Sequence, residues 1–401
     1  MIRSVLSCLC VMLLLGCTPP TQKEPPKTDS AERVPMEEIP PFEDDLDRES
    51  LKTAIEKSLS YFDRIPGDRT FSLGNIQVSA EAVKTSLLHF LGLMETGRLN
   101  RDEVARSFDV YRVGSTGETK DRLLVTGYYE PLLEGRLVQD DEFCYPVYGS
   151  PSDLLTVDLA NFESERFPKE RLVGRLEGSR VVPYYTREQI DGQNSLKSLA
   201  PSLVWLRDPI EAFFLHVQGS GMIRLPEDRL VRVGYAGSNG RPYRSIGKRL
   251  LDKGVIPREE MSLQSIRSYL RAHPEIRDEI LWYNESYVFF RWVNEGPVGS
   301  LNVVLTTGRS VATDVRYYPK GGLAFLQTEK PKLDANGEVT GWEPLNRWVL
   351  NQDTGGAIKG SGRVDLFCGS GEAAERIAGR LKHPGKLYFL LKKEVGDGAG
   401  S

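Results

Sequence analysis

The sequence has few of the residues that bind metal ions or form disulfide bonds. It contains four histidines and five cysteines among 401 residues. The histidines are scattered singly and the cysteine spacing fits no metal-binding pattern, so we expect no metal site and no cofactor. Three cysteines lie within the first 17 residues, which leaves Cys144 and Cys368 for the folded part. Whether these two pair is left open by the sequence, because a disulfide needs the two backbones within bonding distance.

The sequence also lacks an excess of basic residues. Lys and Arg total 52 against 56 Asp and Glu, which gives a net charge of −4 at pH 7. A protein that binds nucleic acid needs a basic patch or stripe, so we expect no nucleic-acid partner. The acidic balance also disfavours an anionic polymer as substrate, whereas a neutral or zwitterionic polymer stays open. A chain of this length is too long for one ordinary core, so we expect two domains.

Only one hydrophobic run is long, and it lies at the N-terminus. The run VLSCLCVMLLL follows Arg3 and ends at Gly16-Cys17. It is too short to span a bilayer as a mature helix, and its basic start and apolar middle are typical of an export signal. The ending LLGC resembles the lipobox of bacterial lipoproteins, so we predict a signal peptide over 1–16 and a lipid on Cys17. A plain signal peptide or a short anchor is the alternative.

Residues 17–49 are rich in proline and acidic residues. Such a composition buries too little apolar surface to fold, so we expect a disordered, extended tether. A tether of this length would let a folded domain work on a polymer layer near the membrane.

Helices are predicted in two parts of the chain. Apolar residues recur at helical spacing over 51–62 and 79–95, and a third helix follows Asn100, which is a good N-cap. Two more helices are expected at about 245–253 and 262–272. These apolar stripes indicate core packing rather than function.

A strand with an unusual polar face is predicted where LLVTGYYEPLLEG begins at Leu123. Thr126, Tyr128 and Glu130 fall on one face by the two-residue period of a strand. A hydroxyl, a phenol and a carboxylate on one side are uncommon in a core strand, so the face is a candidate site. An exposed sheet face is the alternative.

Residues 132–284 consist mainly of short strand-like segments separated by Gly and Pro, which predicts a β-rich domain. In FLHVQGSGMIRL the alternation over 214–218 predicts a strand that is followed by a tight turn. Gln218 and Ser220 would then be placed to hydrogen-bond a sugar. A hairpin whose polar side chains face solvent fits the same pattern.

The stretch QDTGGAIKGSGRVDLFCG (352–369) combines two aspartates with several glycines. Val364 and Leu366 alternate with Asp365, so a strand here would bury one face and present the carboxylate on the other. Asp353 precedes the glycines, which gather where a backbone turns beside a site. The stretch is suited to acid–base chemistry, although a solvated turn would have the same composition.

Four motifs together resemble one known family. TGYYEP (126–131), PYYTREQI (183–190), HVQGSG (216–221) and the stretch at 352–369 resemble the membrane-bound lytic transglycosylase A family of Gram-negative bacteria. The C-terminal part also resembles the 3D domain, which is named for three aspartates. The resemblance runs from about residue 50 to 395, and any one motif alone would be weak.

The resemblance implies a mainly β fold. A double-psi β-barrel with added helices would be built from residues 50–131 and 285–395, with a smaller β-rich domain inserted at 132–284. A peptidoglycan glycan strand would lie in the groove between them. The implied reaction cleaves the β-1,4 bond from N-acetylmuramic acid to N-acetylglucosamine without water and leaves a 1,6-anhydromuramoyl end. The lipid anchor implies the periplasmic face of the outer membrane, with cell-wall synthesis or remodelling proteins as further partners.

By the same resemblance, Asp365 matches a single catalytic acid and base. Thr126, Tyr128 and Asp353 match residues that line the site around it. Asp314 matches less closely, and it would either hold the barrel or line the groove. One carboxyl suffices if the C6 hydroxyl of the sugar is the nucleophile, because it replaces the positioned water of a hydrolase. Asp365 would have to start protonated, so we expect burial or Asp353 to raise its pKa.

Three alternatives stay open. Asp353-Thr354-Gly355 is the tripeptide of aspartic proteases, which need two such aspartates, so a protease would have to be a symmetric dimer. In the second alternative, Asp353 and Asp365 are the two carboxyls of a glycosidase that cleaves the same glycan with water. A non-catalytic peptidoglycan-binding lipoprotein would use neither carboxyl for chemistry.

Overall fold

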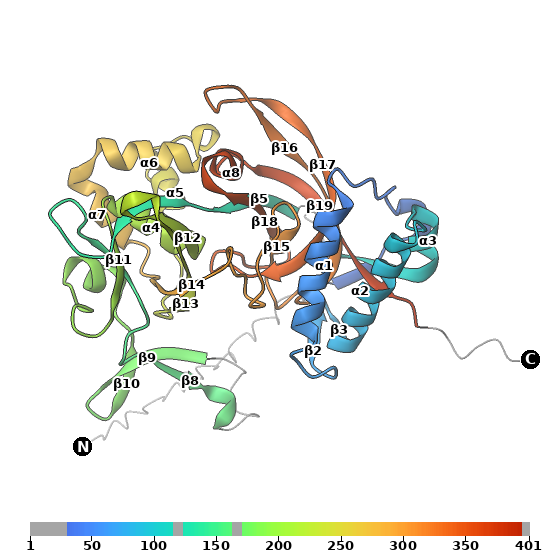
Figure 1. The fold of residues 1–401 in the computed structure, drawn as a ribbon, viewed down its shortest axis with the longest axis horizontal. Coiled ribbons are helices and arrows are strands. Elements are labelled where there is room, and N and C mark those ends of the chain that lie inside the picture. Colours follow the sequence, from blue (N-terminus) through green and yellow to red (C-terminus); the bar gives the residue numbers. More distant parts are fainter. Residues whose placement is uncertain (1–29, 115–122, 163–170, 395–401) are drawn as a thin grey trace, which may run out of the picture.

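The computed structural model describes residues 30–114, 123–162 and 171–394. The predicted signal peptide and Cys17 lie outside these ranges. Two large sheets dominate the described part, with helices on the outer sides (Figure 1). Within these ranges no helix is long and apolar enough to cross a membrane.

The first sheet closes on itself as a barrel. Six strands form the ring: β5 (Leu123–Glu130), β18 (Arg363–Ser370), β15 (Ser310–Ala312), β17 (Val339–Asp353), β16 (Leu323–Leu333) and β19 (Lys382–Lys392). The ring is closed because β19 pairs both with β16 and with β5. Two further strands continue the sheet from β19: β4 (Phe108–Gly114) and β1 (Ser30–Arg33).

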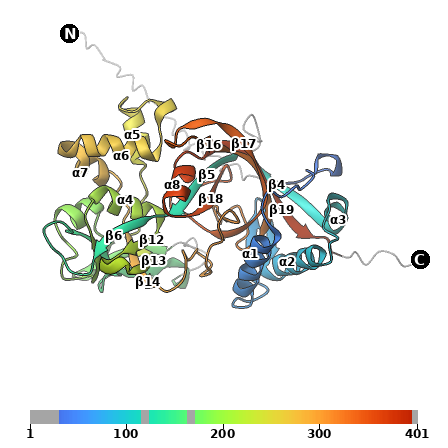
Figure 2. The same cartoon turned by 45° about the horizontal axis from the view of Figure 1, so that its top comes forward.

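Helices from the N-terminal part cover one side of the barrel (Figure 1). They are α1 (Arg48–Phe62), α2 (Ala80–Glu95) and α3 (Arg101–Ser107), with a hairpin of β2 (Thr70–Leu73) and β3 (Ile76–Ser79) between α1 and α2. The three predicted helices are confirmed, and Asn100 caps α3 by accepting from the amide of Glu103 at 2.9 Å. Near the C-terminus, α8 (Gly371–Ala378) lies against β5 and β18 (Figure 2).

The second sheet lies on the opposite side of the barrel from α1 and α2 (Figure 1). In order it contains β14 (Val288–Val293), β13 (Leu230–Ser238), β12 (Ser220–Arg224), β6 (Leu132–Arg136), β11 (Ser202–Leu206) and β7 (Tyr145–Tyr148). The chain enters this sheet from β5 through Pro131, and it stays there through residue 293 rather than leaving at 285 as expected.

Helices and a small third sheet accompany the second sheet. The helices are α4 (Pro209–Gln218), α5 (Ile246–Asp252), α6 (Leu263–Ala272) and α7 (Pro274–Trp282). A three-stranded sheet of β8 (Leu155–Asp158), β9 (Arg171–Glu177) and β10 (Arg180–Pro183) stands apart from the rest (Figure 1). Single helical turns lie at Met36–Glu38, Leu159–Asn161, Glu188–Gly192, Pro226–Asp228 and Arg258–Glu260. A mainly β barrel with added helices and an inserted β-rich part is therefore confirmed.

The strand predicted over 214–218 is wrong, because this segment is the last part of α4. Asp208 caps the helix by accepting from the amide of Ile210, and Pro209 occupies its first turn, where a missing amide costs nothing. Gly219 ends it in the left-handed conformation at φ 77°. The alternation of polar and apolar residues over 214–218 is therefore not that of a strand. The residues that mark the helix, Asp208, Pro209 and Gly219, lie outside this run.

The tether expected over 17–49 is also wrong for its second half. Residues 30–33 form β1, and Phe42 is buried with its ring 4.8 Å from that of Trp348. Asp44 pairs at 2.8 Å with Arg309, a fully buried guanidinium. Asp45 likewise pairs with Arg347 at 2.7 Å, so these two aspartates are counter-charges for arginines of the barrel.

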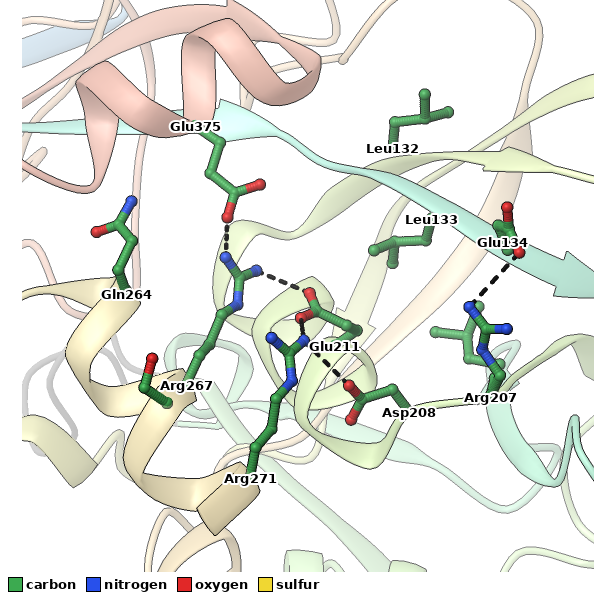
Figure 3. A pocket seen from close by; sticks show the side chains of 12 residues that line it. Leu132, Leu133, Glu134, Arg207, Asp208, Glu211, Gln264, Arg267, Arg271 and Glu375 are labelled. Carbon is green, nitrogen blue, oxygen red and sulfur yellow. Dashed lines mark hydrogen bonds and ion pairs between the residues drawn. The ribbon is translucent and has the colours of Figure 1, made fainter. Parts of the chain in front are cut away.

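A charged cluster joins the barrel to the inserted part where β5 passes into β6. It borders a cavity of about 540 Å³ between α4, α6 and α8 (Figure 3). Arg267 of α6 is 6% exposed and forms ion pairs with Glu375 of α8 and Glu211 of α4. It also donates to the Tyr129 hydroxyl of β5 at 3.1 Å. Arg271 of α6 also pairs with Glu211, at 2.7 Å. Because every charge in it has an oppositely charged partner, we regard this interdomain ion cluster (Arg267, Arg271, Glu211, Glu375) as a structural joint.

Replacing Phe42 tests whether residues 30–49 belong to the fold. Phe42→Ala would leave a cavity against Trp348, so we expect the free energy of unfolding to fall by about 3 kcal/mol. Met36→Ala is the matched control, since Met36 is 58% exposed in the same segment and should change little. Urea unfolding of both variants measures the difference. If Phe42→Ala leaves the free energy of unfolding unchanged, residues 30–49 do not contribute to the fold and the tether prediction would hold for them.

Candidate active site

The candidate site is built on four neighbouring strands held in register. Asp353 of β17 pairs with Ala312 of β15, Ala312 pairs with Asp365 of β18, and Asp365 pairs with Thr126 of β5. Residues opposite each other on adjacent strands point to the same face. The two aspartates are therefore two strands apart, about 10 Å between backbones, with only an alanine methyl between them.

Alternation of side chains aims Asp365 away from the barrel core. Its neighbours Val364 and Leu366 are 0% and 2% exposed inside the barrel, so the carboxyl takes the outer face, as predicted. Asp353 ends β17 just after Gln352, which is fully buried. The Gln352 amide donates to the Ala54 carbonyl at 2.7 Å and accepts from Ser310 at 2.6 Å. These bonds fix the end of β17 and hence the position of Asp353.

Asp353 has hydrogen-bond donors on both carboxylate oxygens. Its Oδ1 accepts from the backbone amides of Ser300 at 2.9 Å and Thr354 at 2.8 Å, and its Oδ2 accepts from the Tyr128 hydroxyl at 3.0 Å. Burial raises the pKa of Asp353 to about 6, although these donors act to lower it. Burial likewise raises the pKa of Tyr128 well above its usual range, so the phenol stays a donor.

Asp365 has a different environment. Its side chain is 14% exposed, and its Oδ1 has no hydrogen-bond partner among the described residues. The nearest cation is Arg363, whose Nη2 lies 3.5 Å from Oδ1. Burial raises the pKa of Asp365 to about 6, while Arg363 lowers it and the charge of Asp353 raises it further. A carboxyl with this pKa, whose oxygens accept no hydrogen bond from the described residues, is suited to give up and recover a proton near neutral pH.

Arg363 was missed in the sequence, although it lies two residues before Asp365 and so on the same face of β18. Its Nη1 donates to the Ala357 carbonyl at 3.3 Å and its Nη2 to the Thr126 hydroxyl at 3.4 Å. Its buried Nε has no partner among the described atoms. The guanidinium therefore links Thr126, Asp365 and the glycine-rich stretch.

Ser300 was missed because its backbone amide, not its side chain, contacts the site. Gly299 allows that approach, since a Cβ there would lie 2.6 Å from the Gln352 carbonyl oxygen. Tyr243, in the loop between β13 and α5, brings the inserted part to the site. Burial raises the pKa of Tyr243, and the charges of Arg363 and Asp365 also act on it.

Asp314 contacts the glycine-rich stretch rather than either of the other two aspartates. Its Oδ2 accepts from the amide of Gly360 at 2.8 Å and from Arg316 at 2.6 Å. Gly360 has φ 83°, which favours glycine. Asp314 thus fastens the turn between β17 and β18, a contact suited to holding the barrel.

The remaining candidates are only partly brought together. Gln218 ends α4 and its Oε1 accepts from the amide of Tyr129 at 3.2 Å. It lines a cavity together with Thr126, whereas Ser220 lies outside that lining at the start of β12. Cys144 and Cys368 are both free thiols. Among the described residues no cluster of three or more His, Cys, Asp or Glu side chains is arranged for a metal ion.

Comparison with known protein families supports the resemblance. The family described as MltA specific insert domain matches residues 124–291, and the 3D domain matches residues 309–391. Membrane-bound lytic murein transglycosylase A of Escherichia coli K12 is 34% identical over 281 residues, which are 69% of this chain and 67% of that protein.

Solved structures agree with the sequence comparison. Membrane-bound lytic murein transglycosylase from Agrobacterium tumefaciens superposes with a TM-score of 0.74 at 30% identity, covering 90% of this chain and 98% of that one. MltA from Neisseria gonorrhoeae, in its monoclinic form, gives 0.66 at 32% identity, covering 93% and 97%. These proteins therefore share the fold over nine-tenths of this chain. The chain therefore belongs to the membrane-bound lytic murein transglycosylase A family.

Proposed function

We propose that this chain is a peptidoglycan lytic transglycosylase. It cleaves the β-1,4 bond from N-acetylmuramic acid to N-acetylglucosamine and leaves a 1,6-anhydromuramoyl end. The observation that carries the proposal is the contrast between two buried carboxyls on one sheet face. Asp353 accepts hydrogen bonds from three donors, whereas neither carboxyl oxygen of Asp365 accepts one from the described residues, and its one charged partner is Arg363 at 3.5 Å.

In the proposed reaction Asp365 acts first as an acid and then as a base. Its proton moves to the glycosidic oxygen as the bond from that oxygen to C1 of muramic acid breaks. The C6 hydroxyl oxygen of the same sugar then bonds to C1, and its proton returns to Asp365. No water is consumed, so one carboxyl is enough, and the internal hydroxyl replaces a positioned nucleophile.

Arg363 has a defined part in this proposal. A guanidinium can only donate hydrogen bonds, so the oxygen of Asp365 that faces it is the carbonyl oxygen of the neutral acid. The transferable proton is therefore expected on Oδ2. Once that proton has left, the same guanidinium stabilises the carboxylate. Tyr128 and its partner Asp353 support the site without carrying the proton.

The alternatives are weighed by the same geometry. An aspartic protease needs two carboxyls that share one proton. In a dimeric protease Asp353 of one copy would share a proton with Asp353 of the other. Both oxygens of Asp353 already accept hydrogen bonds within its own chain, which argues against a protease. A hydrolytic pair stays open, because both carboxyls point to one face. The two reactions differ in their products: hydrolysis adds water and leaves a reducing muramic acid end, whereas transglycosylation leaves a 1,6-anhydro end.

We propose that the chain works at the periplasmic face of the outer membrane, anchored by a lipid on Cys17. The LLGC ending supports this, and the E. coli relative is described as membrane-bound. A Cys17→Ser variant that still separated with membranes would argue against the anchor.

Asp365→Asn tests the acid and base. We expect at least a 1,000-fold loss of muropeptide release, since an amide neither donates a carboxyl proton nor recovers one. Asp353→Asn is the comparison, and its smaller loss would reflect a site that is reshaped but keeps its acid. Mass spectrometry should find anhydro ends in the wild-type products. Reducing ends instead would favour the hydrolytic pair, and an unimpaired Asp365→Asn would favour a role without catalysis.

Arg363→Gln tests how the pKa of Asp365 is set. The acid must start protonated, so kcat/KM should fall as pH rises above about 6. Arg363 lowers this pKa, so its removal should shift the falling limb of the pH profile to higher pH, by about one unit. Arg207→Gln, far from the site, should leave the profile in place. A limb that stays or moves to lower pH in Arg363→Gln would contradict this role.

Stability gives a test of the pKa of Asp365 that needs no substrate. The folded pKa of about 6 lies above the ordinary value of 3.8, so the folded state binds more protons and loses stability as pH rises from 4 to 7. Asp365→Asn removes this loss, so the variant should gain about 2 kcal/mol over the wild type at pH 7.5 and almost nothing at pH 4. Urea unfolding at the two pH values measures the difference. An equal effect at both would show an unshifted carboxyl.

A further inference from the structure

A second cavity, of about 700 Å³, lies beside the candidate active site, between α5, α6 and the barrel strands β17 and β19. Thr126 lines it, and the Thr126 hydroxyl is 3.4 Å from Nη2 of Arg363, which is 3.5 Å from Asp365. The cavity therefore begins one side chain away from the proposed acid. Its volume is in the range of sites that hold small organic ligands.

Charged side chains of both signs line this cavity. Lys382 lies opposite Thr126 on β19, and Arg258 comes from the helical turn before α6. Glu259 and Glu260 follow Arg258 in the same turn. None of these four side chains has a hydrogen-bond or ion-pair partner within the described residues. This differs from the interdomain ion cluster, in which every charge has an oppositely charged partner.

Polar and apolar groups complete the lining. An apolar wall is formed by Leu251 of α5, Met261 just before α6, and Ile266 of α6. Gln218 presents its amide nitrogen as a free donor, because its oxygen already accepts from Tyr129. Such a lining suits a ligand that has amide carbonyls, small apolar side chains, carboxylates and an amine.

We propose that this cavity, which we call the stem cavity, binds the peptide stem attached to the muramic acid next to the scissile bond. Lys382 and Arg258 would pair with stem carboxylates, Glu259 and Glu260 with a stem amine, and Gln218 with a peptide carbonyl. An uncharged glycan would leave these four charges unmatched, which favours a peptide as the occupant. The proposal rests on the proposed function, because the stem is joined to the same sugar on which Asp365 acts.

The test compares glycan strands that carry stems with the same strands after an amidase has removed them. We measure kcat/KM for the release of muropeptides or bare disaccharides, and take the ratio between the two substrates. The wild type should prefer stem-bearing strands. In a double variant, Lys382→Gln with Arg258→Gln, that ratio should fall about 10-fold, the size expected for two exposed charge contacts.

A matched double variant removes the same charges elsewhere. Lys386→Gln with Arg180→Gln alters exposed residues outside the cavity and should leave the ratio unchanged. A free stem peptide should also inhibit the wild type competitively and the first double variant more weakly.

The outcomes separate this inference from the proposed function. If the wild type releases anhydro ends from both substrates equally well, the function stands and the stem cavity is refuted. If the first double variant loses activity equally on both substrates, the cavity binds glycan and the inference is again refuted. If no anhydro ends form from either substrate, the proposed function itself fails.

Discussion

The register of β17, β15, β18 and β5 is the constraint on which the candidate site depends. Barrel closure through β19 and β5 fixes that register, because no strand of the ring can slip without its neighbours. The register places Asp353 and Asp365 on one face with Ala312 between them. A larger residue at position 312 would fill the space between the carboxyls, and a slip by one residue would turn Asp365 into the core.

Local sequence patterns predict helices, strands and side-chain directions correctly where several consecutive residues fit only the helix period or only the strand period. The outward direction of Asp365 follows from its two apolar neighbours, and the cap at Asn100 follows from its residue type. Tyr128 and Asp353 lie 225 positions apart, so periodicity could not predict their hydrogen bond. The motifs predicted only that both residues line the same site. Motif resemblance supplied that long-range information where periodicity could not.

The wrong or missing predictions concern residues 30–49, α4 and Ser300. Their structure depends on contacts that cannot be read from the composition of the segment itself. The acidic segment before α1 looked solvated, yet Asp44 lies against Arg309, 265 residues further along the chain. The apolar run in α4 fits both the helix and the strand period, and the signals at its two ends, Asp208-Pro209 and Gly219, decide for the helix. Ser300 acts through its backbone amide, which no side-chain pattern reveals.

The start of the fold at β1 has a consequence for the reach of the enzyme. If a lipid on Cys17 holds the chain, only residues 18–29 separate the membrane from Ser30. Twelve residues span at most about 40 Å when fully extended, whereas a tether ending at residue 49 would allow more than twice that. The candidate active site would then reach only the murein nearest that membrane. Distance from the bilayer, as much as chemistry, would decide which glycan strands are cut.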